Sequence, residues 1–310
     1  MTRNCRLYAM LFVLACLSIF APARLGAQML EDMEPGQQPR FLINGAGLYL
    51  PSTHVSGGGD VSMQSYSLAA RSQVPVNDRL NLGMGLSYQS DNYHFSKLTD
   101  FASPDPWGSV NTVGLNASVM YRLSPEWRFF AAPGGQYAGE DGADFGKSLV
   151  YGGTVGAFYR PKPGFTIGFG AGIFHRLDET SFFPAFIFSW KITDNLRLGN
   201  SSVTGPGGPA GLELAYKIDS NWETALAGGY HTNRFRLDSS GPVSNGIGEF
   251  DSWPLFVRLS RKLNQNLRLD LYGGAAVGGK LKLEDSRGHE IDRTSYKTAP
   301  LGGLTLTTMF

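Results

Sequence analysis

The sequence predicts an all-β protein: a transmembrane, antiparallel, up-and-down β-barrel of about 14 strands, with 12 as the fallback count. Three observations carry this prediction. Apolar residues alternate with small or polar ones along many segments, similar turn phrases recur between those segments, and the chain ends on an aromatic residue after an alternating run. A strand with one apolar face and one face of small or polar residues is typical of a barrel wall that separates lipid from the lumen. The competing fold, a soluble β-sandwich, usually carries charge on its second face.

The alternation is clearest in segments 79–89, 112–121, 165–173 and 267–278. In segment 165–173 every second residue from Phe165 is apolar, and the intervening positions are threonine or glycine. Side chains that alternate with period 2 point to opposite faces of a strand. We therefore expect the glycine-rich face to line the lumen.

A recurring phrase marks the turns between strands. KITDNLRL (191–198), KIDSNWET (217–224) and KLNQNLRL (262–269) are three versions of it, and YRLSPEWRF (121–129) is a looser fourth. A short polar turn between two alternating runs predicts a β-hairpin.

The predicted strands are 40–50, 61–73, 79–94, 108–123, 127–138, 148–160, 165–176, 182–192, 196–203, 209–218, 222–237, 249–262, 267–283 and 294–310. Short connections alternate with longer ones at 51–60, 95–107, 139–147, 238–248 and 284–293. Bacterial barrels have even strand numbers, short periplasmic turns and longer outer loops. Both chain ends then lie on the periplasmic side.

Four prolines fit this strand assignment poorly. Pro133, Pro184, Pro254 and Pro300 lie within predicted strands, and a closed barrel has no free edge for a residue without an N–H. We expect bulges or flared strand ends at these positions, with an error in the strand limits as the alternative.

The N-terminal segment predicts export. Arg3 and Arg6 precede an apolar run of 14 residues, 7–20, which is too short to span a bilayer and has the length of a signal-peptide core. Cleavage is expected after Ala27, with Ala23 as the alternative and a lipoprotein site at Cys16 as a weaker one. The predicted organisation is a signal peptide (1–27), a short periplasmic lead-in (28–39) and a barrel (40–310).

Composition and motifs argue against several other classes of function. Removal of residues 1–27 takes three arginines and both cysteines, which leaves 24 basic and 26 acidic side chains and a net charge of −2. Nucleic-acid binding, which needs a basic domain, is therefore not expected. The sequence contains no nucleophile elbow, zinc-protease motif or phosphate loop. We predict no enzyme and no cofactor, although His54, His94, His175, His231 and His289 all map to the loop half of the strands.

The hairpins resemble a bacterial outer-membrane barrel family that is known only as a domain of unknown function. The matching stretches are GGGDVSMQSYSLAA (57–70), PVNDRLNLGMGLSY (75–88), AGEDGADFGKSLVYGGTVGAFYR (138–160), DLYGGAAVGGKLKLED (270–285) and YKTAPLGGLTL (296–306). The resemblance implies a barrel fold and a location in the outer membrane of a Gram-negative bacterium, and it supplies no activity and no site residues.

The last strand has the outline of a signal read by barrel-assembly machinery, which is an expected partner. Gly303, Leu304, Leu306 and Phe310 match that outline, whereas Thr308 stands where an aromatic residue is common. The alternative is that any last barrel strand alternates in this way.

Aromatic residues are expected to form two girdles at the membrane interfaces, in contact with lipid and lipopolysaccharide. Those beside the short turns are Tyr121, Trp127, Tyr159, Trp190, Tyr216, Trp222 and Phe310. Those near the loops are Tyr88, Tyr93, Tyr137, Tyr230, Trp253 and Tyr296.

Basic residues near the turns are predicted to point into the lumen as a modestly positive collar. They are Arg79, Arg122, Arg128, Arg160, Lys191, Arg197, Lys217, Arg258 and Arg268. A charged ring selects ions in a pore, and the alternative is an internally paired wall. In the loops, Glu140, Asp141 and Asp144 form a weak candidate for a hard cation, but their spacing matches no known calcium loop, so no metal is predicted.

From these features we expect a passive pore or transporter for small solutes across the outer membrane. A non-conducting barrel that binds lipopolysaccharide or a partner is the alternative, and an outer-membrane hydrolase is the third hypothesis. Solute, selectivity, plugging and oligomeric state are not fixed by the sequence.

Overall fold

The computed structural model describes residues 38–200, 205, 206, 208 and 211–310. The predicted signal peptide and nearly all of the lead-in lie outside these residues. The strands are β1 (Arg40–His54), β2 (Asp60–Pro75), β3 (Leu80–Ser96), β4 (Ser109–Arg122), β5 (Trp127–Glu140), β6 (Leu149–Lys162), β7 (Phe165–Arg176), β8 (Glu179–Lys191), β9 (Leu196–Asn200), β10 (Leu212–Lys217), β11 (Trp222–Gly228), β12 (His231–Arg236), β13 (Ile247–Lys262), β14 (Leu267–Glu284), β15 (Glu290–Tyr296) and β16 (Ala299–Met309).

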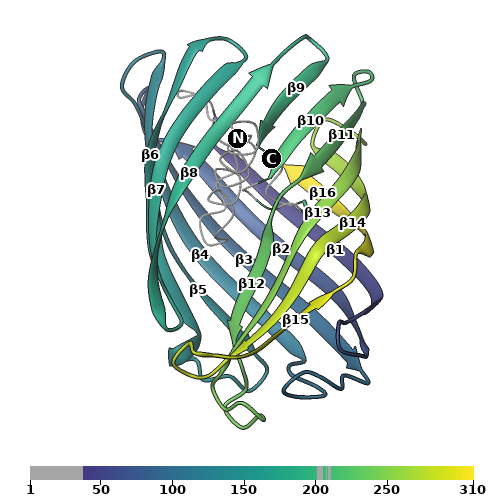
Figure 1. The fold of residues 1–310 in the computed structure, drawn as a ribbon. Helices are drawn as coiled ribbons and strands as arrows, with labels where there is room; N and C mark the ends of the chain where they lie inside the picture. The colour runs from purple at the N-terminus through teal and green to yellow at the C-terminus, as the bar shows by residue number, and fades with distance from the viewer. Residues whose placement is uncertain (1–37, 201–204, 207, 209–210) are drawn as a thin grey trace, which may run out of the picture.

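These strands build one closed antiparallel barrel of 14 wall strands, as predicted. The wall closes where β1 pairs with β16, from Leu42 opposite Met309 to Tyr49 opposite Gly302. Two predicted strands are each divided: β11 and β12 both pair with β13, and β15 and β16 both pair with β14. Figure 1 shows the strands running between short turns at the top and longer loops at the bottom. We call these the turn end and the loop end.

Helical structure is slight in the described part of the chain. A 3-10 helix of one turn, η1 (Gly146–Ser148), precedes β6. None of the described residues forms a helix with the length and apolar character needed to cross a membrane.

The recurring phrase at the turn end has a backbone explanation. In each turn the apolar residue before the polar triplet donates its N–H to the carbonyl of the apolar residue after it, as Ile218 does to Trp222 at 2.9 Å. The next side chain, Ser, Thr, Asp or Asn, accepts N–H groups from within the turn, as Asp219 does from Asn221 and Trp222. Short polar side chains favour turns because they form such local bonds. The same chemistry recurs at 76–80, 123–127, 192–196 and 263–267.

Three of the four prolines lie where the hydrogen-bond ladder is interrupted. Pro254 follows a register shift between β13 and β14, and Pro300 lies beyond the end of β1–β16 pairing. Pro133 lies in a gap of the β4–β5 ladder. Pro184 lies outside Ser189–Lys191, the part of β8 that pairs with β9 among the described residues. The expected bulges and strand ends therefore describe Pro133, Pro254 and Pro300, where a residue without an N–H is tolerated.

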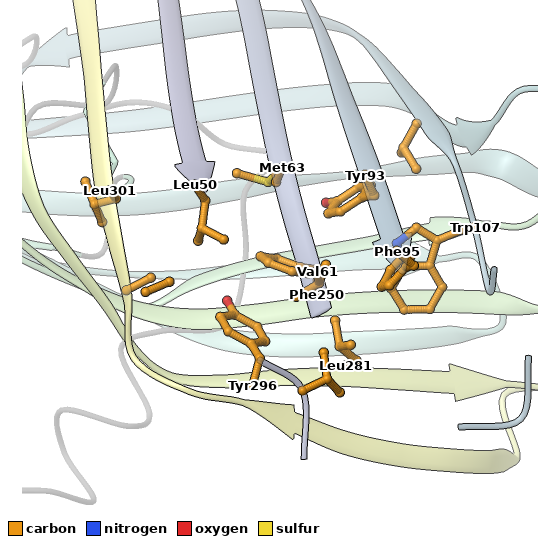
Figure 2. Close-up of a cluster of buried hydrophobic side chains, with 14 of the residues drawn as sticks. Leu50, Val61, Met63, Tyr93, Phe95, Trp107, Phe250, Leu281, Tyr296 and Leu301 are labelled. Atoms are coloured by element: carbon orange, nitrogen blue, oxygen red, sulfur yellow. The ribbon is translucent and has the colours of Figure 1, made fainter. Parts of the chain in front are cut away.

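The loop half of the barrel interior holds a large cluster of buried apolar side chains. Figure 2 shows them projecting from the strand walls toward one another. We call this group the loop-end cluster. Its members include Leu50, Val61, Met63, Tyr93, Phe95, Trp107, Phe235, Phe250, Leu281, Tyr296 and Leu301.

Strand β12 completes the cluster from the side of β13. Its last residue, Arg236, lies opposite Gly139 of β5, which is far from β13 in the order of wall strands. The ring of Phe235 stacks on Tyr93 with centroids 6.0 Å apart and meets Trp107 edge-on at 5.5 Å. Since β12 bridges the mouth in this way, the barrel narrows at its loop end.

Candidate functional site

Gly168 and Gly170 on the inner face of β7 leave no open space beside them. A Cβ atom at Gly168 would lie 2.6 Å from Cβ of Phe158, and one at Gly170 would lie 2.6 Å from the carbonyl oxygen of Val155 and 3.3 Å from the Phe130 ring. Large rings on neighbouring strands cover these glycines, because a strand position without a side chain gives room for one from the next strand.

These rings form an apolar wall inside the barrel on β4 to β8. Met120, Phe130, Phe158 and Ile187 are all buried and belong to one hydrophobic cluster. Phe174, which is 1% exposed, extends the same face toward the loop end. The interior therefore has an apolar side, which we call the aromatic wall.

The opposite side of the interior is polar. A cavity of about 100 Å³ there is lined by Asn44, Ser65, Ser67, Arg71, Gln89, Asp91, Pro206, Thr305 and neighbouring residues of β1, β2, β3 and β16. The buried carboxylate of Asp91 accepts hydrogen bonds from Gln89 Nε2 at 2.9 Å and from Asn233 Nδ2 of β12 at 2.7 Å. This contact fixes β12 to β3.

Toward the turn end, three of the nine predicted collar residues form an ion-pair network in one sector. Arg258, which is 1% exposed, donates to Glu213 with Nε at 3.0 Å and Nη2 at 2.6 Å, and to Glu223 at 2.7 Å. Its Nη1 lies 3.4 Å from the fully buried carboxylate of Asp270. Paired, bidentate contacts of this kind are the usual condition for burying charge.

Two further collar residues join the same network. Arg197 Nη2 lies 3.0 Å from Glu213 Oε1, and Arg268 Nη2 lies 3.0 Å from Asp270 Oδ2. Three guanidinium groups thus face three carboxylates, and the sector is neutral rather than positive. The internally paired wall, the alternative considered from the sequence, describes this sector.

The other predicted collar residues do not join this network. Arg79 lies in a turn before β3, Lys191 pairs with the turn residue Asp194 at 2.8 Å, and Lys217 is exposed at the end of β10. Arg122 is half-buried at the end of β4. The remaining two are inside the barrel: Arg128 lies over the Phe158 ring, 5.8 Å from its centroid, and Arg160 Nε is 3.4 Å from Thr166 Oγ1.

At the loop end, Arg236 connects several loops through their carbonyl groups. The side chain is 2% exposed. It donates to the carbonyl oxygens of Lys147 at 3.1 Å, Asn245 at 2.7 Å, Leu177 at 2.9 Å and Ser286 at 3.3 Å. One guanidinium group thus joins the connections after β5, β7, β12 and β14.

A second arginine of β12, Arg234, also connects this strand to the loop end of other strands. Arg234 Nη1 lies 2.7 Å from Asp178 Oδ1 in the β7–β8 connection, and its Nη2 pairs with the buried Glu284 of β14. Together, Arg234 and Arg236 hold β12 across the mouth, and we call them the loop-end clamp.

The aromatic residues expected near the turns lie on the barrel exterior or half-buried at its edge. Tyr121, Trp127, Trp190, Tyr216 and Phe310 are exposed, whereas Tyr159 and Trp222 are half-buried. Among those near the loops, Tyr88 and Trp253 are also exposed, but the girdle prediction is wrong for Tyr93 and Tyr296. These two are 7% and 4% exposed because they belong to the loop-end cluster.

The predicted assembly-signal residues lie along β16 and at its end. Leu304, Leu306 and Phe310 are exposed on the barrel exterior, Gly303 is half-buried, and Phe310 exchanges backbone hydrogen bonds with Phe41. Their recognition by assembly machinery stays a prediction.

The acidic loop residues serve separate structural contacts. Glu140 accepts the N–H groups of Gly108 and Asp238, Asp141 accepts from Asn111, and Asp144 accepts the Lys147 N–H. The described residues contain no group of three or more His, Cys, Asp or Glu arranged to hold a metal ion.

Three histidines contact groups other than serine. His175 Nδ1 lies 3.3 Å from Thr180 Oγ1, His54 Nδ1 lies 3.7 Å from Asp60, and His289 Nδ1 lies 3.1 Å from Asp285. None of these pairs is the serine–histidine contact that nucleophilic hydrolysis requires.

Comparison with known proteins places the chain in a family without a known activity. The chain belongs to the family described as a domain of unknown function (DUF6268), whose model matches residues 45–296. No curated protein matches the sequence.

Solved structures with a similar fold are outer-membrane proteins. An outer membrane channel from Pseudomonas putida F1 is 11% identical with a TM-score of 0.48, over 90% of this chain and 98% of that one. A FadL homologue from Pseudomonas aeruginosa is 12% identical with a TM-score of 0.44, over 88% and 89%. The toluene transporter TbuX from Ralstonia pickettii is 10% identical with a TM-score of 0.44, over 95% and 99%. At these identities the likeness concerns the fold alone.

Proposed function

We propose that this chain is an outer-membrane transporter for small apolar solutes and not an open diffusion pore for ions. The single observation that carries the proposal is the loop-end cluster, in which buried apolar side chains from many strands pack together in the loop half of the barrel.

The cluster discriminates between solutes by their hydration. An ion that enters such a site loses its water shell without gaining polar partners, which costs several kcal/mol or more. An apolar solute gains by leaving water at about 25 cal/mol per Å² of buried surface. On the turn-end side of the cluster, the aromatic wall formed by Met120, Phe130, Phe158 and Ile187 offers apolar contacts on one side of the interior.

The first test is single-channel conductance of refolded residues 28–310 in a planar bilayer with a salt gradient. We expect no conductance steps from the folded protein, and steps from the double variant Phe235→Ala with Phe250→Ala, which removes two buried rings of the cluster. Hydrophobic constrictions gate ion flow by excluding water. Steady ion steps from the wild-type barrel would contradict the closed apolar mouth.

The second test measures passage of an apolar solute. In whole cells with intact lipopolysaccharide, production of the chain should speed the entry of N-phenyl-1-naphthylamine. Ile187→Lys places a charge on the aromatic wall and should abolish the gain. Ser67→Lys is the matched control, because Ser67 lines the polar side of the interior. Equal entry with and without the chain would overturn the proposal.

A non-conducting structural barrel is the second candidate, and the loop-end clamp favours it. Arg236 joins four connections, so a permanent closure is consistent with its contacts. Silence in the bilayer together with unchanged solute entry would select this function over transport.

A further inference from the structure

The outer face of the barrel wall contains two hollows, both between the middle of the wall and the loop end. The first has a volume of about 940 Å³ and follows β5 from Pro133 to Tyr137, between β4 and β6. The second has a volume of about 440 Å³ and follows β1 from Gly47 to Tyr49, between β16 and β2. We call them the β5 hollow and the β1 hollow.

The β5 hollow is a groove with a glycine as its floor. Gly135 lies opposite Leu115 of β4 and opposite Tyr151 of β6, and both of these side chains are exposed on the outer face. Tyr137, two residues nearer the loop end, closes the groove there, and its ring stacks on Phe145 with centroids 5.6 Å apart.

The β1 hollow repeats this arrangement on another part of the wall. Gly47 lies opposite Leu304 of β16 and opposite Tyr66 of β2, and both side chains are again exposed. Tyr49 follows two residues nearer the loop end. In both hollows the leucine comes from the preceding strand of the barrel and the tyrosine from the next one. The same groove is therefore built twice from strands that are unrelated in sequence position.

Neither floor glycine is required by a close neighbour or by its backbone. A Cβ at Gly47 would meet no atom of the described chain within 4 Å. A Cβ at Gly135 would make ordinary contacts, at 3.5 Å with the carbonyl oxygen of Val150 and at 3.7 Å with Cβ of Tyr151. Neither glycine has a positive φ. A larger residue would fit at both positions, so the effect of glycine there is to leave the groove open.

The position and width of the grooves select the occupant. The outer face of a transmembrane barrel contacts hydrocarbon, and an apolar hollow that stays empty loses the dispersion contacts of its lining. Neighbouring strands are about 4.8 Å apart, so the leucine and tyrosine strands lie about 10 Å apart across the glycine. This spacing leaves room for one extended hydrocarbon chain along the strand. It is too narrow for the wall of a second barrel.

The closing tyrosines indicate the side of the membrane from which the chain enters. Tyr137 and Tyr49 stand at the loop ends of the two grooves. Interfacial tyrosines place their hydroxyl groups among lipid headgroups and their rings against the chains. A chain in either groove therefore belongs to a lipid whose headgroup lies at the loop end, which is the outer leaflet.

We propose that each hollow binds one acyl chain of lipopolysaccharide, the outer-leaflet lipid, as a retained ligand. The two sites lie on the outside of the wall, apart from the loop-end cluster and the aromatic wall. Their occupancy does not depend on passage of a solute through the interior, so this proposal and the proposed transport function fail separately.

The test is native mass spectrometry of the full chain, purified from outer membranes of a deep-rough host whose lipopolysaccharide is short and uniform. The protein is exchanged into lipid-free detergent before measurement. We expect two lipopolysaccharide molecules per barrel, because β1 and β5 are four strand spacings apart in the wall, about 19 Å. Phospholipid is distinguished by its mass.

Variants assign the retained lipid to the hollows. Gly135→Phe and Gly47→Phe each fill one groove and should each lower the number of bound lipopolysaccharide molecules from two to one, and the double variant should retain none. Val257→Phe is the matched control, because Val257 is exposed on the outer face of β13 and lines neither hollow. It should keep both molecules.

A second pair of variants covers the case in which the phenylalanine variants do not fold, as judged by the heat-modifiable band. Tyr151→Ala and Tyr66→Ala each remove one side of a groove without adding bulk, and each should lose one lipopolysaccharide molecule. Three results would overturn the proposal: no lipid retained by the wild-type barrel, phospholipid retained in place of lipopolysaccharide, and two molecules retained by the folded double variant or by both tyrosine variants.

Discussion

Two regions of this barrel interior, the loop-end cluster and the ion-pair sector of the turn half, are filled with opposite chemistry. In the loop half, inward positions carry apolar rings and aliphatic chains that pack into a single cluster. In the turn half, one sector carries three arginines and three carboxylates in contact. Apolar packing contributes stability in proportion to buried area, whereas a buried ion pair contributes little net stability and is costly to break. The halves should therefore respond differently to substitution.

The largest expected effect comes from breaking the ion-pair network. Arg258→Met keeps the length of the side chain but removes the nearest counter-charge of Glu213 and one of the two counter-charges of Asp270, both of which are almost fully buried. Removing one partner of a buried pair costs about 3–5 kcal/mol. The measurement is the urea midpoint for loss of the heat-modifiable, folded band in detergent.

A matched control is Arg261→Met on the same strand. Arg261 is exposed and lies over the Trp222 ring, 5.1 Å from its centroid, so its loss should cost under about 1 kcal/mol. Addition of Glu213→Gln and Asp270→Asn to Arg258→Met should restore much of the lost stability, because neutral partners no longer need the arginine. Failure of that rescue would show that packing, and not charge, dominates the turn half.

Glycine substitutions test whether an inward glycine of the barrel wall is required by packing. The adjacent pair Gly273 and Gly274 provides a matched comparison. A Cβ at Gly274 would collide with the backbone of Leu255 and lie 2.6 Å from Cα of Phe256, whereas one at Gly273 meets nothing within 4 Å. Gly274→Ala should lower the free energy of unfolding by about 1–3 kcal/mol through overpacking, and Gly273→Ala should not lower it. The same urea midpoint measures both, and equal midpoints would mean that the strands adjust freely.

Much of the barrel could be predicted from the sequence, and the inner contents could be predicted in part. Period-2 alternation predicted the strands of the barrel wall. The same alternation continues to the loop end of β3, where Tyr93 and Phe95 share the inward parity of Asn81 and Gly83 and were therefore predictable as interior residues. Glu213 likewise shares the parity of Lys217 on β10 and could have been paired with the collar.

Other residues could not be predicted by parity. The strand is interrupted between β11 and β12. In β12, the successive residues Arg234, Phe235 and Arg236 are all buried. A strand that crosses the mouth is covered on both faces, so alternation carries no information there. Tyr296 is buried for a similar reason, since β15 and β16 are separated by two residues that reset the alternation.

The smallest expected effect is a pH response at the turn end, where a carboxylate caps a turn. Asp219 accepts N–H groups from Asn221 at 2.7 Å and Trp222 at 2.9 Å, and these bonds hold the pKa of its carboxyl below the ordinary value. A lowered pKa in the folded state means that the stabilisation is present above the unfolded value of about 4 and is lost as pH falls through the folded pKa. The turn should therefore loosen only in acid.

Amide hydrogen exchange of the 218–222 turn, corrected for intrinsic rates, measures this response. Protection should fall below about pH 4 in the wild type and stay constant in Asp219→Asn, whose amide oxygen accepts the same bonds without titrating. The turn at 263–267 is the internal control, because its capping residue is Asn264. A fall in protection at both turns would place the acid sensitivity in the barrel as a whole, including the buried ion pairs of the turn half, and not in the Asp219 cap.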